Sequence, residues 1–322
     1  MSTMSATRVG GVVSRCITVG PWSTDWLSIT PPSASNTITL IVPGNPGVVS
    51  YYEQFMIELY EHLNRTSAVW AVSHTCHSKT YPTPNSTVDR EVEHKIQFIR
   101  SHVPHGSQLR LVGHSIGCQM ILQVLDELDN VEAIGVANDS FKIDQCYMLF
   151  PTIERMKDSP RGRTLWPVLA YCRWLPPFIC SCVSIMPNFV KEKLASVILY
   201  DGSGVPLLDS VVESFITNVR PDMVRNMLDL AHNELETVVD LDIDAVSRHK
   251  SKLVFYYGSN DHWSPVKYKE DLVEKVPGVV AFVCQKNINH AFVVRQAREM
   301  ASELAIIIKE VEELQGVLDR DG

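Results

Sequence analysis

Five residues, Gly113-His114-Ser115-Ile116-Gly117, have types and spacing that suit nucleophilic chemistry, because they follow the pattern G-x-S-x-G. In a nucleophile elbow of this kind, a serine occupies a strained turn between a strand and a helix, and small flanking residues let neighbouring segments pack closely. The flanks fit, since residues 108–112 (QLRLV) have the composition of a short strand and residues 118–128 (CQMILQVLDEL) carry apolar side chains at helical spacing. An ordinary glycine-flanked turn is the alternative. We therefore predict that Ser115 is a nucleophile.

A serine hydroxyl is a weak nucleophile at neutral pH, so it needs a histidine base and a carboxylate that orients the histidine. In α/β-hydrolases these residues follow in the order serine, acid, histidine. Asp261 follows the apolar run KLVFYY, and His290 follows the next run, VVAFVC. Asp144 is the competing acid, but it precedes its strand and would lie at the wrong end of the sheet. The sequence favours a Ser115, Asp261 and His290 triad.

An oxyanion hole requires two main-chain N–H groups directed at the developing charge. One is expected from Ile116, directly after the nucleophile. The other is expected from a loop after an early strand, where Pro43-Gly44-Asn45-Pro46-Gly47 is suitably placed. Pro46 cannot donate, so Asn45 is the candidate. A tight turn also explains the composition of this loop, and the two interpretations are compatible.

His74 and His77 form a close pair that invites a metal interpretation. No carboxylate or further ligand completes a recognisable metal spacing around them. We therefore predict no metal and no cofactor. The two histidines are instead expected to line the mouth of the pocket, at the carboxyl end of a strand where α/β sheets bind ligands.

Apolar runs rich in β-branched residues alternate with helical patterns along the chain. This alternation predicts an α/β fold of the α/β-hydrolase type, with a mostly parallel sheet and helices on both faces. A crossover helix is indicated by apolar residues every three or four positions, namely Val88, Val92, Ile96, Ile99 and Val103. The predicted strands are 37–42, 68–72, 108–112, 145–150, 252–257 and 279–284, and a final helix is predicted over 291–314.

The strand pattern stops between residues 151 and 250, where the sequence is helix-like and broken by prolines. We interpret this part as a cap inserted after the strand at 145–150. The expected organisation is a variable N-terminal segment over residues 1–35 and one hydrolase domain over residues 36–322, with the cap inside it. A chain of 322 residues with 45% hydrophobic residues is long enough to bury the core of such a domain.

The net charge bears on the expected partners, and the first 19 residues bear on the expected compartment. The net charge is −8 and the sequence has no basic stripe, so no nucleic-acid partner is expected. The first 19 residues contain no apolar run long enough for a signal peptide. A location on the cytosolic side follows, and the eight cysteines are then expected to be free thiols.

Residues 165–190 are almost entirely apolar and include a single charge, Arg173. Prolines divide this stretch into halves of about a dozen residues, or roughly 18 Å of helix, which is shorter than a hydrocarbon core of ~30 Å. Two apolar arms that meet at Pro176-Pro177 suit a monotopic anchor. A lid that covers the pocket is the alternative, and both can hold. The expected membrane contacts are Trp174, Leu175, Phe178 and Ile179.

Several sequence blocks together resemble the lipid droplet-associated hydrolase family. They are Ile41-Val42-Pro43-Gly44-Asn45-Pro46-Gly47, Gly113-His114-Ser115-Ile116-Gly117, Leu149-Phe150-Pro151-Thr152-Ile153-Glu154-Arg155-Met156, Ser159-Pro160-Arg161-Gly162-Arg163, Phe255-Tyr256-Tyr257-Gly258 and Asn287-Ile288-Asn289-His290-Ala291-Phe292. The resemblance is weakest in the first 35 residues and in the apolar cap. It implies an α/β-hydrolase fold with a triad at Ser115, Asp261 and His290. It further implies cytosolic lipid droplets and the endoplasmic reticulum surface as locations, and a role in lipid storage with sterol esters as the usual proposed substrate.

Three function classes remain open at this level. The first is an ester hydrolase that acts on neutral lipid esters through an acyl-enzyme at Ser115. The second is a droplet-coating or tethering protein that keeps the hydrolase frame but performs little chemistry, and the intact triad favours the first class over it. The third is an acyltransferase, which would use the same residues. Epoxide hydrolases and dehalogenases need a carboxylate nucleophile, so the serine at the elbow disfavours them.

Overall fold

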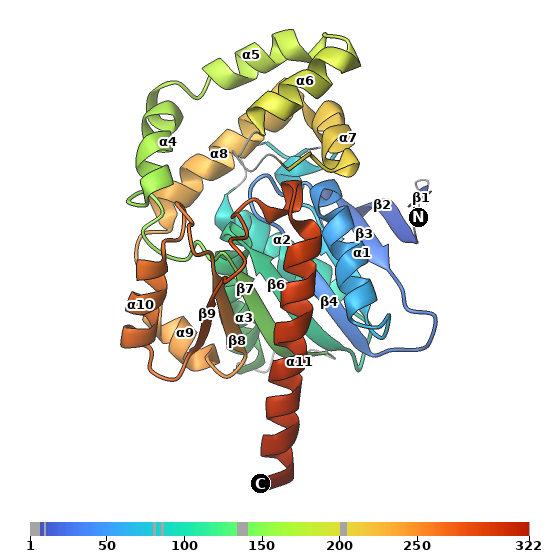
Figure 1. Cartoon of the computed structure of the whole chain (residues 1–322), viewed down its shortest axis with the longest axis vertical. Coiled ribbons are helices and arrows are strands. Elements are labelled where there is room, and N and C mark those ends of the chain that lie inside the picture. The colour runs from blue at the N-terminus through green and yellow to red at the C-terminus, as the bar shows by residue number, and fades with distance from the viewer. Residues whose placement is uncertain are drawn as a thin grey trace.

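The computed structural model contains a nine-stranded, mostly parallel sheet in the order β1-β2-β3-β5-β4-β6-β7-β8-β9 (Figure 1). It describes residues 7–9, 11–79, 82–84, 87–133, 141–199 and 205–321. Strands β4 to β9 are parallel, whereas β1, β2 and β3 join antiparallel at one end. The strands are β1 Thr7–Val9, β2 Val12–Val19, β3 Trp22–Ile29, β4 Thr37–Val42, β5 Ala68–Val72, β6 Gln108–His114, β7 Lys142–Leu149, β8 Leu253–Tyr257 and β9 Val280–Val283.

The central strands agree well with the sequence analysis, and the outer strands agree less well. Strands β4 and β5 have the predicted bounds, while β7 begins three residues earlier than predicted, at Lys142. The strand predicted at 279–284 is present as β9, but it is a shorter edge strand with Val280 and Phe282 exposed, so the expectation of a fully buried strand was wrong there. No strand was predicted for residues 12–29, where β2 and β3 form a hairpin through Gly20, which has a positive φ of 56°.

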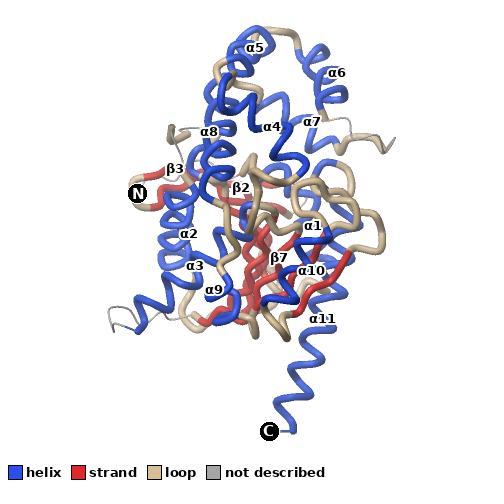
Figure 2. The backbone as a smooth tube through the Cα atoms, turned by 90° about the vertical axis from the view of Figure 1, so that its left-hand side faces the viewer, coloured by secondary structure: helices blue, strands red, loops and turns tan. Residues whose placement is uncertain are grey.

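Helices cover both faces of the sheet, as the alternation of elements predicted. Figure 2 shows the strands as a layer with α2, α3 and α9 on one side and α1 and α11 on the other. Each side encloses its own apolar cluster, one around Phe98, Ile121 and Leu125 and the other around Phe55 and Leu304. These helices are α1 Glu53–His62, α2 Val88–His102, α3 Ile116–Ala133, α9 Ile243–His249 and α11 Ala297–Asp321, and α10 Val266–Lys275 lies beside β9.

The crossover helix α2 occupies the predicted position. It begins at Val88, where the side chain of Thr87 accepts a hydrogen bond from the main chain of Arg90 and caps the helix. Four of the five predicted apolar positions are buried, and Ile96 is half-buried. The predicted final helix is divided, because a short 3-10 helix, η3 Phe292–Val294, precedes α11.

Five helices lie above the carboxyl ends of the parallel strands and form the cap (Figure 1, top). They are α4 Pro160–Tyr171, α5 Leu175–Ser184, α6 Asn188–Ile198, α7 Asp209–Asn218 and α8 Pro221–Thr237. The next helix, α9, packs against α3 beside the sheet, so the cap helices end with α8 although residues 151–250 were assigned to the cap. No helix within the described residues is long and apolar enough to cross a membrane.

The break in the apolar segment lies just before the position where it was expected. The chain leaves α4 at Tyr171 and enters α5 at Leu175, and Pro176 and Pro177 stand in the first turn of α5. Proline is compatible with a first helical turn, because the N–H that it lacks would have no helical partner there. The two prolines therefore begin the second helix, and the bend falls at residues 172–174.

Candidate active site

The nucleophile elbow has the geometry that its sequence predicts. Ser115 stands between β6 and α3 with a left-handed φ of 54°, a conformation that non-glycine residues seldom adopt. A Cβ atom added at Gly117 would lie 2.2 Å from the carbonyl oxygen of Val42, and one at Gly113 would lie 2.9 Å from Cα of Cys118. Both glycines are therefore required for close packing around the strained serine.

Three side chains from distant parts of the chain meet at this elbow. Nε2 of His290 lies 2.9 Å from Oγ of Ser115, and Nδ1 of His290 lies 2.7 Å from Oδ2 of Asp261. Asp261 is on the loop after β8, and His290 is on the loop between β9 and η3. The arrangement has the contacts that a serine, a base and an orienting acid require.

The environment of Asp261 keeps its carboxyl ionised although the side chain is almost fully buried. Burial alone would raise the pKa of Asp261, but the neighbouring His290 and a hydrogen bond from the main-chain N–H of Trp263 together lower it below its ordinary value. The competing acid, Asp144, lies within β7 and shares a surface depression with Thr37 and Gln108, which begin their strands. Asp144 is thus at the opposite end of the sheet from Ser115.

The predicted oxyanion donors lie beside the nucleophile. A Cβ added at Gly44 would lie 3.0 Å from Cβ of Ser115, so the loop over residues 43–47 runs directly past the serine. The N–H of Gly44 donates to the hydroxyl of Tyr52 at 2.8 Å and is therefore occupied. Among the described residues, none accepts a hydrogen bond from the main-chain N–H of Asn45 or of Ile116. Both N–H groups therefore lie near Ser115 without an acceptor among the described residues.

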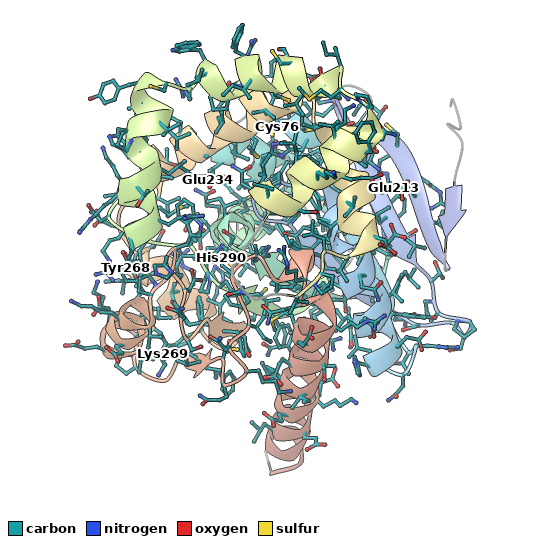
Figure 3. All side chains as sticks on the ribbon, turned by 45° about the horizontal axis from the view of Figure 1, so that its top comes forward. Cys76, Glu213, Glu234, Tyr268, Lys269 and His290 are labelled. Carbon is teal, nitrogen blue, oxygen red and sulfur yellow. The ribbon has the colours of Figure 1, made fainter. Side chains whose placement is uncertain are left out.

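A cavity of about 360 Å³ opens at Ser115 and His290. Its walls come from the sheet domain and from the cap, and they are mostly apolar. The cap contributes Leu165 from α4, Leu199 at the end of α6 and four residues of α8, while Met156 comes from a loop and Val293 and Val294 come from η3. One wall residue, Glu234 of α8, is acidic and buried, and Figure 3 labels it together with His290. The cavity suits an apolar chain with a reactive group near the serine.

Tyr52 and His114 form a hydrogen-bonded chain that the sequence analysis missed. The Tyr52 hydroxyl lies 2.6 Å from Nδ1 of His114, and Nε2 of His114 lies 2.9 Å from the main-chain oxygen of His290. Burial, assisted by the neighbouring His290, lowers the pKa of His114 to about 3, so this imidazole is neutral. No local pattern marks Tyr52, whereas the place of His114 inside the elbow motif was a usable signal.

His74 and His77 do not line the cavity, so the prediction that they do was wrong. Both are completely buried, beside the buried pair Glu91 and Lys95. Nδ1 of His77 accepts a hydrogen bond from the N–H of Gly47 at 3.1 Å, which supports the 43–47 loop from behind. The cap covers this strand end, since α8 packs on the short helix that holds His77. Within the described residues, no group of three or more potential metal ligands occurs.

The predicted membrane contacts lie on the outer part of the cap. Trp174, Leu175, Phe178 and Ile179 are exposed, and α5 forms the outermost edge of the molecule in Figure 1. Further large apolar side chains are exposed on α4, the α5–α6 connection and α6, namely Tyr171, Ile185, Met186, Phe189, Val197 and Ile198. Nη1 of Arg173 lies 3.7 Å from Oδ1 of Asp229 on α8, so this charge is directed toward the rest of the cap.

Comparison with known proteins links this geometry to one family. A family model described as lipid-droplet associated hydrolase matches residues 35–293. The human lipid droplet-associated hydrolase is 32% identical over 317 residues, covering 94% of this chain and 93% of the human protein. The Drosophila melanogaster lipid droplet-associated hydrolase is 28% identical over 317 residues, covering 91% of this chain and 94% of its own.

Solved structures support the fold. A serine hydrolase of carbazole degradation superposes with a TM-score of 0.61 at 14% identity, covering 92% of this chain and 99% of its own. The Cif epoxide hydrolase from Acinetobacter nosocomialis superposes with a TM-score of 0.66 at 12% identity, covering 93% and 90%. The chain thus has an α/β-hydrolase fold. Because a serine hydrolase and an epoxide hydrolase both have this fold, the side chains at the elbow must determine which reaction is possible.

Proposed function

Because the chain belongs to the lipid droplet-associated hydrolase family, we propose that it is a serine hydrolase that cleaves lipid esters at the surface of lipid droplets. The observation that carries this proposal is the contact of His290 with both Ser115 and Asp261, at 2.9 and 2.7 Å. Family membership and fold support a hydrolase. The serine mechanism, the ester substrate and the role in lipid storage are the proposed parts.

In the proposed first step, Oγ of Ser115 attacks the ester carbonyl while Nε2 of His290 takes the serine proton. Asp261 holds the other ring nitrogen and stabilises the imidazolium that forms. The carbonyl oxygen becomes an oxyanion, which the free N–H groups of Asn45 and Ile116 are placed to receive. His290 then protonates the departing alcohol, and an acyl-enzyme remains on Ser115.

In the second step, water attacks the acyl-enzyme with His290 again acting as the base, and the fatty acid leaves as Ser115 regains its proton. An alcohol in place of water would give acyl transfer through the same residues. The apolar walls of the cavity support a substrate with a long hydrocarbon part, such as a sterol ester or another neutral lipid ester.

The exposed apolar residues of the cap support a lipid monolayer as the docking surface. A droplet has a single phospholipid layer over neutral lipid, so a helix with a polar segment at each end does not fit it, whereas short amphipathic helices do. Large apolar side chains of α5 and α6, among them Phe178 and Phe189, are exposed, and Lys191 and Lys193 of α6 are expected to remain at headgroup level. The cytosolic face of the endoplasmic reticulum offers a similar surface.

The proposal is tested with emulsions of a sterol ester and of a triacylglycerol, incubated with the wild type and with Ser115→Ala. Release of fatty acid by the wild type alone supports an ester hydrolase, and the ratio of the two rates identifies the preferred alcohol. Acyl transfer to an added sterol, with little free acid, would support the transferase instead. Equal release by both proteins would contradict a role for Ser115.

A further inference from the structure

The side-chain amide of Asn45 connects the 43–47 loop to the cap. Its Nδ2 donates one hydrogen bond to the main-chain oxygen of Met227 at 2.9 Å and another to Oε1 of Glu234 at 3.0 Å. Both acceptors belong to α8 and are two helical turns apart, so they lie on the same helix face. The two amide hydrogens of Asn45 are thereby both directed to the cap.

The same loop is held on its other side by the sheet domain. The N–H of Gly44 donates to Tyr52, and the N–H of Gly47 donates to His77. Between these fixed points, the main-chain N–H of Asn45 has no acceptor among the described residues. The direction of its N–H group therefore depends on the side-chain contacts with α8.

Glu234 is an unusual acceptor for this role, because it is a buried acid without a basic partner. It lines the cavity with only 4% of its surface exposed, and no ion pair of Glu234 occurs in the described part of the chain. Burial raises the pKa of Glu234 to about 8, and the hydrogen bond from Asn45 opposes that rise only partly. The carboxyl is consequently neutral at pH 7.

We propose that Glu234 is a positioning residue, which holds Asn45 from the cap and so completes the oxyanion hole only when α8 is in place. This inference rests on the proposed function, because it assigns a role to Glu234 in the same reaction. Glu234 acts through Asn45 and does not touch the reacting atoms. The cap is therefore part of the catalytic arrangement as well as a wall of the cavity.

A pH dependence follows from this arrangement. Ionisation of Glu234 would place a negative charge one hydrogen bond away from the donor of the oxyanion, which disfavours the charge that develops in the transition state. Activity should therefore decline as the pH rises above about 8, where this carboxyl loses its proton. Ionisation of Glu234 is not expected to raise the rate of any step that Glu234 influences.

Other groups near Glu234 do not supply this decline in the same range. Burial raises the pKa of Tyr51 to about 12, raises that of Tyr52 as well, and lowers that of His114 to about 3. The charged residues on the neighbouring turns of α8 are held in pairs outside the cavity wall, Asp229 with Arg173 and Glu236 with His232. Among the described residues that line the cavity, the remaining titratable group is His290, which Glu234 variants leave in place.

The test compares Glu234→Gln, Glu234→Leu and the matched control Glu236→Gln, which changes an exposed acid two residues along α8. Activity on a water-soluble short-chain ester separates catalysis from lipid docking. Glutamine keeps an acceptor oxygen for Asn45 but cannot ionise, so we expect kcat at pH 7 within about threefold of wild type and no alkaline decline. Leucine removes the acceptor, so we expect kcat to fall about 10- to 100-fold with KM nearly unchanged.

A second background identifies the route of the effect. In Asn45→Ala, the side chain that Glu234 holds is gone, so adding Glu234→Leu should lower kcat little further. The inference is overturned if Glu234→Leu keeps the wild-type kcat, if its effect is undiminished in Asn45→Ala, or if Glu234→Gln keeps the alkaline decline. If Glu234→Leu does not fold, the pH dependence of Glu234→Gln still tests the inference. Absence of ester hydrolysis by the wild type would instead contradict the proposed function, and this inference with it.

Discussion

The hydroxyl of Tyr52 lies 2.6 Å from Nδ1 of His114, and this contact fixes the proton positions of a chain that joins three loops. Nε2 of the neutral His114 faces the carbonyl oxygen of His290, which can only accept, so the ring proton is on Nε2. Nδ1 must then accept from Tyr52, whose oxygen in turn accepts from the N–H of Gly44. The 43–47 loop, the elbow and the loop that carries His290 are thereby held in fixed positions relative to one another.

Replacing Tyr52 with phenylalanine removes the donor to His114 and the acceptor for Gly44 while keeping the ring. We expect a loss of about 1–3 kcal/mol in the free energy of unfolding, since two buried polar groups lose their partner. The kcat should also fall about tenfold, because Gly44 no longer fixes the 43–47 loop, which holds the proposed donor Asn45. Denaturant unfolding and ester kinetics measure both. Tyr60→Phe is the control, as its hydroxyl makes one long bond of 3.4 Å to Thr30. Equal effects of the two substitutions would contradict the account.

The Asp261→Asn variant should fold normally but lose about 10³- to 10⁴-fold in kcat, because an amide partner favours the wrong imidazole tautomer of His290. Asp144→Asn serves as the control and should retain activity, since Asp144 lies at the other end of the sheet. The two purified variants are compared by steady-state ester hydrolysis and by circular dichroism. A larger loss in Asp144→Asn than in Asp261→Asn would overturn the assignment of the acid.

A variant should move from droplets into the cytosol without unfolding when serine replaces Trp174, Leu175, Phe178 and Ile179. All four side chains are exposed, so their removal takes little apolar area from the core. Droplet flotation and imaging of the tagged protein measure the distribution. A matched control carries four serines at exposed apolar positions of the body, namely Val239, Ile243, Val273 and Ile306. Retention of the cap variant on droplets would mean that this segment is only a lid.

The sequence anticipated the central strands and the meeting of Ser115, Asp261 and His290 because these features leave local marks. Buried parallel strands such as β4 and β5 are continuous apolar runs, and a triad acid and base must follow such runs at the carboxyl edge. The strand ends were less visible, because β7 begins with the polar residues Lys142 and Asp144.

Features that depend on packing between distant segments were missed. The antiparallel strands β2 and β3 carry mixed polar and apolar side chains and so lacked a continuous apolar pattern, whereas β9 has such a pattern but is an edge strand with Val280 and Phe282 exposed. His74 and His77 were placed at the pocket because the rule for strand ends takes no account of α8, which covers them. Glu234 was also missed because its proposed role depends on a contact with Asn45, which is 189 positions away in the sequence.

The central claim, that Ser115 is an activated nucleophile held by His290, is tested most directly with a fluorophosphonate probe, which reacts covalently with activated serines. The purified protein is labelled, digested, and the modified peptide is identified by mass spectrometry, with Ser115→Ala and His290→Ala in parallel. The account predicts a single phosphonylated site at Ser115 in the wild type, no label in Ser115→Ala and strongly slowed labelling in His290→Ala. Undiminished labelling of Ser115→Ala, or a wild type that does not react, would contradict it.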